Sequence, residues 1–192
     1  MSIRKRGRDD GDDREGEAKR AKSSPNKPDR PRALNPRAGP GPREHRVLVT
    51  GYRFWVDHAV IESALKRVEE AHPDDALVLI HGAALGADTM AAAIAQRRNW
   101  AVISVPAEWA KYGKKAGPIR NKRMVTDFYA NEAIAFVHPN SRGTLDCIEH
   151  VKEHMKLPHS RLKELRVYTC GMDGKVPVER VPEDMKKEKT AE

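Results

Sequence analysis

Short apolar segments rich in β-branched residues alternate with longer segments of helical periodicity, and this alternation limits the folds open to the chain. Residues 46–50 and 76–80 are two of the apolar segments. Residues 57–71 between them repeat apolar side chains at helical spacing behind Asp57, a predicted N-cap. Strands apolar on both faces are typical of parallel sheets covered by helices. The pattern predicts an α/β fold: a Rossmann-like, doubly wound, mostly parallel sheet of about five strands with helices on both faces.

The same alternation continues to residue 169. Further strands are predicted over residues 101–105, 133–137 and 165–169. Further helices are predicted over residues 87–99, from about 118 to 129, and over 144–155, with a long polar loop at 106–118. In such folds ligands bind beyond the carboxyl ends of the strands, so the loops that follow the strands are the candidate site.

Both ends of the chain lack the apolar residues that a core needs. We expect residues 1–43 to be a disordered, basic and proline-rich tail, residues 44–170 to be the folded domain, and residues 171–192 to be a charged tail. Of the formal net charge of +8, residues 1–46 carry +6 and the rest of the chain carries +2. The high pI is therefore a weak argument that the folded domain binds nucleic acid.

The sequence predicts an intracellular, cytoplasmic protein without a membrane partner. Cys147 and Cys170 form no paired motif, which suits a reducing compartment. No apolar run follows the charged N-terminus or is long enough to span a bilayer. The basic clusters at residues 4–8 and 19–22 suit a nuclear import signal or nucleic-acid contacts, and equally a solubilising tail. The sequence also leaves open whether the chain forms a homo-oligomer.

Glycines, cations and aromatics recur at the ends of four predicted strands, and we take them as ligand-binding candidates. The first two loops contribute Gly51, Arg53, His81, Gly82, Gly86 and Asp88. The third and fourth loops contribute Trp109, Tyr112, Gly113, Lys114, Gly117, Arg120, Asn121, Ser141, Gly143 and Thr144. Glycines at a helix N-terminus suit an anion, arginine and lysine neutralise phosphate, and aromatic rings stack on bases. Taken singly, each loop also has an explanation without a ligand: a surface turn, a carboxylate that caps a helix, or a solvated charged loop.

Common cofactor motifs are absent from the sequence. Residues 81–88 lack the Gly-Lys-Ser/Thr of a Walker A loop and are not a GxGxxG segment. No cluster of metal ligands or catalytic triad is apparent, so neither a cofactor nor a metal is predicted.

The loop motifs resemble the YspA/YpsA-related branch of the SLOG superfamily, which includes the Smf/DprA DNA-processing proteins and the Lonely Guy enzymes. The resemblance covers about residues 46–169. It rests on Thr-Gly-Tyr-Arg-Phe-Trp from 50, His-Gly-Ala-Ala-Leu-Gly-Ala-Asp from 81, the segment 106–124 and Ser-Arg-Gly-Thr-Leu-Asp from 141. It implies a Rossmann-like domain whose rim binds a nucleotide or nucleotide derivative, as a sensor or regulator. Asp88 would then hold a ribose hydroxyl.

Two other functions stay open. One is hydrolysis of an N-glycosidic bond, as in Lonely Guy phosphoribohydrolases, with Asp88 or Asp146 as acid/base and Arg120 stabilising charge. Lonely Guy enzymes carry Pro-Gly-Gly-x-Gly-Thr-x-x-Glu, whereas Cys147 stands in the place of that Glu here and Asp146 precedes it. The other function is DprA-like nucleic-acid binding, in which the basic tail would take part.

Overall fold

The computed structural model describes residues 39–170 and the backbone of residues 178–180. The predicted N-terminal tail lies outside the described residues except for its last five positions. The predicted C-terminal tail lies outside them except for residues 178–180. None of the described helices combines the length and the apolar character needed to cross a lipid bilayer.

A single six-stranded sheet with the order β3-β2-β1-β4-β5-β6 forms the centre of the domain. The strands are β1 (Glu44–Gly51), β2 (Ala76–His81), β3 (Ala101–Ser104), β4 (Glu132–Val137), β5 (Glu164–Thr169) and β6 (Val178–Arg180). The first five strands run parallel, and β6 pairs antiparallel with β5. The α/β, Rossmann-like prediction is confirmed, and the sheet gains a short sixth strand.

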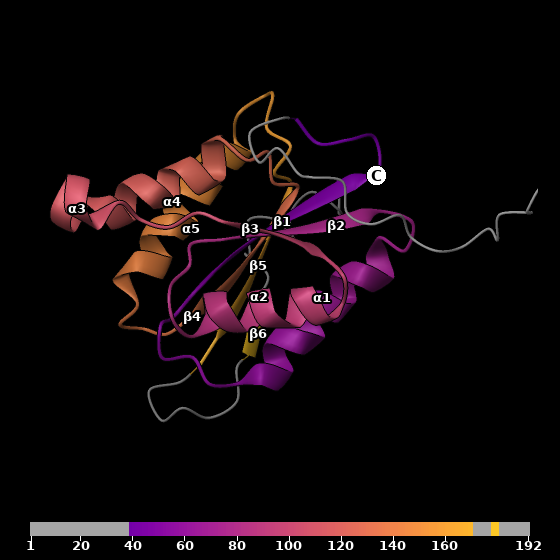
Figure 1. Ribbon diagram of the computed structural model, residues 1–192, viewed down its shortest axis with the longest axis horizontal. Helices are drawn as coiled ribbons and strands as arrows, with labels where there is room; N and C mark the ends of the chain where they lie inside the picture. The colour runs from indigo at the N-terminus through magenta and orange to yellow at the C-terminus, as the bar shows by residue number, and fades with distance from the viewer. Residues whose placement is uncertain (1–38, 171–177, 181–192) are drawn as a thin grey trace, which may run out of the picture. The chain divides into compact units, whose positions relative to one another are not determined.

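Helices cover both faces of this sheet (Figure 1). The helices are α1 (His58–Ala71), α2 (Ala87–Arg97), α3 (Trp109–Tyr112), α4 (Ala116–Thr126) and α5 (Arg142–Met155), with a 3₁₀ turn η1 (Gly113–Lys115) between α3 and α4. Asp57 caps α1 as predicted, because its Oδ1 accepts the Val60 N–H at 3.2 Å. Figure 1 shows α1 and α2 on one face and α4 and α5 on the other.

The alternation of side chains along β1 explains the two cores. Val47 and Val49 join the apolar cluster under α1 and α2, whereas Leu48 joins the cluster under α4 and α5. Successive residues of a strand point to opposite faces of the sheet, so a continuously apolar strand serves both clusters. All three side chains are fully buried.

The strand order places a topological switch point between β1 and β4. From β1 the chain moves through β2 to β3 at one edge, and it then crosses through α4 to β4 on the other side of β1. The loops that follow β1 and β4 therefore lead to opposite faces and leave a crevice between them.

The prediction of a polar loop over residues 106–118 is wrong. The structure contains α3, η1 and the first turn of α4 in this segment. Gly117 and Pro118, at the end of the predicted loop, lie within the first turn of α4. A proline is tolerated there because the first N–H groups of a helix have no partner within the helix.

Candidate ligand-binding site

A cavity of about 850 Å³, here called the main cavity, opens among the loops that follow the parallel strands. It is lined by Arg53, Gly82, Ala83, Ala84, Leu85, Pro106, Ala107, Trp109, Gly117, Pro118, Arg120, Asn121, Arg142, Gly143 and Asp146. A neighbouring hollow of about 380 Å³, the side cavity, also includes Arg53, Arg120 and Arg142 in its lining. Residues from all four loops that follow the strands therefore line two neighbouring cavities.

Three arginines from three different elements surround both cavities. Arg53 follows β1 and Arg142 begins α5, and both side chains are exposed. Arg120 lies in α4 and is half-buried; its Nη1 donates to the carbonyl of Gly82, and its Nε donates to Asn121 Oδ1 at 2.9 Å. Three guanidinium groups around one hollow attract an anion and offer planar donors to phosphate or carboxylate.

Gly82 is needed for the position of Arg120. A Cβ atom at this residue would overlap the Arg120 guanidinium group. The absent side chain lets an arginine of α4 reach the loop that follows β2, so the two sides of the main cavity are joined.

Asp88 supports this loop from inside the protein. The side chain is 3% exposed, and its Oδ2 accepts the N–H groups of Gly82 at 2.9 Å and Ala84 at 3.3 Å. Its Oδ1 is buried without a well-formed hydrogen bond. Burial raises the pKa of Asp88 to about 6, against the opposing effects of the Arg120 charge and of backbone N–H groups. Asp88 lines the side cavity only.

Gly86 lets the loop after β1 pack on the N-terminus of α2. Its φ is +75°, and a Cβ atom there would lie 2.5 Å from the carbonyl carbon and oxygen of Arg53. The Ala87 N–H donates to the Tyr52 carbonyl at 3.3 Å. Gly51 also serves packing, because a Cβ atom at this residue would overlap Ala87. One N–H at the start of α2 is thus already bonded within the protein.

Asn121 connects the two helices that border the cavity. Its side chain is 3% exposed, and Nδ2 donates to the Gly143 carbonyl at 3.0 Å and to Asp146 Oδ2 at 2.8 Å. Ser141 and Thr144 are buried and line the side cavity at the start of α5. The main cavity thus has a fixed carboxylate, Asp146, beside the exposed arginines.

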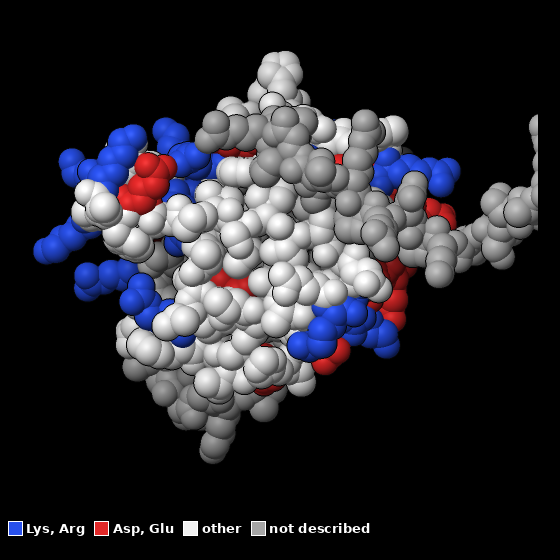
Figure 2. Space-filling model, viewed as in Figure 1, with Lys and Arg blue, Asp and Glu red and all other residues white. Residues whose placement is uncertain are grey.

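The third loop contributes one aromatic ring to the cavity. Trp109 is 57% exposed and lines the main cavity, and a Cβ atom at Gly117 would lie 3.5 Å from Cη2 of its ring. Tyr112, Gly113 and Lys114 line neither cavity, although the sequence placed them with the site. Lys and Arg side chains gather at the end of the molecule where α3 and α4 lie (Figure 2).

His81 lines neither cavity and instead shapes the loop after β2. Its Nδ1 accepts the Ala83 N–H at 3.2 Å, so Nε2 carries the proton and donates to the Ser104 hydroxyl at 2.6 Å. Burial, and the charge of Arg120, lower the pKa of His81. Ala83 is held at a φ of +56°, a left-handed conformation.

Sequence reasoning missed several residues of the lining. Arg142 belongs to the Ser-Arg-Gly-Thr motif and lines the main cavity, but it is not among the residues predicted from the sequence; its place at a helix start beside Ser141 and Gly143 is a usable signal. Leu85 is 72% exposed and lines the main cavity, yet an isolated apolar residue in a loop gives no signal of this role.

Comparison with known proteins gives two matches. A family model described as the YspA, cpYpsA-related SLOG family matches residues 45–112, the part of the chain from β1 to α3. The Gene 61 protein of Mycobacterium phage D29 is 36% identical over 118 residues, which cover 56% of this chain and 89% of the phage protein. No solved structure matches the chain.

Proposed function

Because the chain belongs to the YspA, cpYpsA-related SLOG family, we propose that it binds a nucleotide or nucleotide-derived ligand in the main cavity and acts as a sensor or regulator. The observation that carries the proposal is the convergence of Arg53, Arg120 and Arg142 with the exposed ring of Trp109 on one cavity. The guanidinium groups suit phosphate, and an exposed indole suits a base.

The size and the walls of the main cavity support a ligand of this class. A volume of about 850 Å³ lies within the usual range for small-molecule sites. Apolar residues such as Leu85 and Pro106 line it beside the arginines, which fits a molecule with one flat apolar part and one anionic part. The phosphate would lie near the arginines, and the base would lie near Trp109.

Thermal melting of the full chain tests the proposal with NAD, ADP-ribose, cyclic dinucleotides and nucleoside monophosphates as probes. One class is expected to raise the melting temperature, because a ligand at 100 times its Kd stabilises the folded state by about 2.7 kcal/mol. Arg142→Ala is expected to weaken that binding about tenfold, the usual loss for one charge-assisted hydrogen bond.

Arg161→Ala is the matched control, because Arg161 is exposed and precedes the amino end of β5, away from the cavity. It should bind the probe as the unaltered chain does. A flat response to every probe, or equal losses in the two variants, would contradict the assignment.

Hydrolysis of an N-glycosidic bond is a second candidate, favoured by the two carboxylates. Asp146 lines the main cavity, where it could reach a ligand, and the raised pKa of Asp88 suits a group that exchanges protons near neutral pH. Cys147 is buried, and burial raises the pKa of its thiol to about 12, so it does not replace the missing Glu.

Incubation with the nucleotide that shifts the melting temperature separates turnover from binding. If the chain is a hydrolase, chromatography is expected to show a free base, and Asp146→Asn is expected to abolish its release while binding persists. The asparagine keeps an oxygen that accepts from Asn121, so the site should stay intact. If the nucleotide binds but no free base is released, the function as a sensor or regulator is favoured over hydrolysis.

A further inference from the structure

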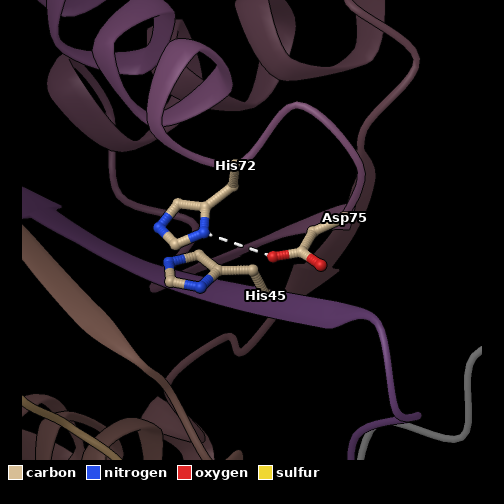
Figure 3. A group of neighbouring side chains, drawn as sticks. All are labelled: His45, His72 and Asp75. Carbon is tan, nitrogen blue, oxygen red and sulfur yellow. Dashed lines mark hydrogen bonds and ion pairs between the residues drawn. The ribbon is translucent and has the colours of Figure 1, made fainter.

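A group of three side chains lies together at the amino ends of β1 and β2 (Figure 3), whereas the main cavity lies beyond the carboxyl ends of the strands. His45 belongs to β1, His72 directly follows α1, and Asp75 directly precedes β2. One donor atom from each residue lies within 4.8 Å of the donor atoms of the other two. The side chains of His72 and Asp75 are each 32% exposed and that of His45 is 12% exposed, so the group is partly open to solvent.

The backbone that carries these residues is well fixed. The Asp75 N–H donates to the His72 carbonyl at 3.3 Å and closes a turn that contains Pro73. The His72 N–H donates to the carbonyls of Val68 and Glu69 at the end of α1. His45 lies on the neighbouring strand, paired in register with Leu77 of β2. Three segments are thus held together before any ion binds.

A buried carboxylate orients the first histidine. His45 Nε2 lies 3.2 Å from Glu132 Oε1, and Glu132 also pairs with Arg166. In the tautomer that donates from Nε2 to Glu132, the lone pair of His45 Nδ1 is left free. A carboxylate on the far ring nitrogen is typical of histidines that bind metals.

The second histidine and the aspartate are in direct contact with each other. His72 Nδ1 lies 3.2 Å from Asp75 Oδ2 (Figure 3), a contact that needs a shared proton. A metal ion can take the place of that proton, because a neutral imidazole nitrogen and a carboxylate oxygen are both ligands.

We propose that His45, His72 and Asp75 bind one divalent transition-metal ion of the Zn²⁺ type, with water completing the coordination. Two imidazoles and one carboxylate suit zinc, cobalt or nickel better than magnesium or calcium, which prefer oxygen ligands. The two rings are stacked with centroids 3.6 Å apart and an interplanar angle of 23°. At least one ring must therefore turn on binding, so that its nitrogen lone pair points at the ion.

The bound ion would fasten the start of β1 to the turn between α1 and β2. Because the ligands belong to the folded chain and come together only there, the ion is expected to raise the melting temperature. This site is independent of the nucleotide proposal, since none of its residues lines either cavity.

Titration of the full chain, prepared without an affinity tag, with Zn²⁺ and Co²⁺ tests the site by calorimetry and by visible absorption of the cobalt form. One ion per chain is expected, with an absorption band typical of nitrogen and oxygen ligands. His72→Ala and Asp75→Asn should each weaken binding at least about tenfold, as losses around metal sites do.

The control variant is His150→Ala. His150 and His154 lie four residues apart on α5, so they are another pair of histidines that could bind a metal ion. It should leave the affinity unchanged. Thermal melting without metal shows whether each variant is folded. If His72→Ala does not fold, Asp75→Asn still tests the site, because it preserves the size of the side chain. No binding by the unaltered chain, unchanged binding in both folded site variants, or loss in the His150 variant would overturn the proposal.

Discussion

Replacement of Gly86 by alanine is expected to lower the free energy of unfolding by about 4 kcal/mol, measured by denaturant unfolding. The residue has a φ of +75° and a ψ of −123°, a region that is nearly restricted to glycine and costs other residues about 1 to 3 kcal/mol. The new Cβ would also lie 2.5 Å from backbone atoms of Arg53, and overpacking of this kind costs about 1 to 3 kcal/mol more.

Gly113→Ala separates these two contributions. Gly113 has similar dihedral angles, a φ of 50° and a ψ of −133°, but apart from its own local backbone and chain neighbours no atom lies within 4 Å of the position of its Cβ. We expect a loss of about 1 to 2 kcal/mol, from backbone strain alone. Equal losses in the two variants would show that the packing of the β1 loop on α2 adds nothing to stability.

The ionisation of Asp88 is expected to make stability depend on pH. The pKa of this carboxyl is about 6 in the folded chain and near its ordinary value, 3.8, when unfolded. The folded state therefore holds the proton more tightly, and acidification favours folding. Relative to Asp88→Asn, the unaltered chain is expected to gain about 2 kcal/mol of stability between about pH 7.5 and about pH 4.

The comparison with Asp88→Asn isolates this one group. The lowered pKa of His81 acts in the opposite direction, because protonation of that ring favours the unfolded state, but it is present in both proteins. The asparagine oxygen can still accept from the N–H groups of Gly82 and Ala84. Parallel stability profiles for the two proteins across this pH range would show that Asp88 ionises normally.

The fold could be predicted because local and tertiary preferences agree along most of the chain. Residues 47–49 and 133–137 are apolar without interruption, and the structure buries both segments between two layers of helices. The short elements had no such signal. Helix α3 has no buried residue, and β6 is three residues long, so neither has enough apolar periodicity to be detected.

The site was predicted in outline because the carboxyl ends of parallel strands meet at one edge of the sheet. Arg53, Arg120 and Gly143 come together there as expected. The partner of each polar group was not predictable. Asp88 bonds to N–H groups of its own loop, and His81 bonds to Ser104 of the neighbouring strand. Both pairings depend on the conformation of the loop after β2, which cannot be read from the order of the residues. The ligand roles given to these residues stay predictions.

The antiparallel strand β6 determines at which residue a truncated form of the domain should end. Among the described strands, the sheet ends at β3, with four residues, and at β6, with three. Short edge strands offer another chain few unpaired backbone groups, which limits edge-to-edge aggregation. Ending the chain at residue 170 would make the six-residue β5, with Leu165 and Val167, the new edge. A trimmed domain that keeps residues up to 180 retains the strand that covers this edge and should stay better dispersed at high concentration.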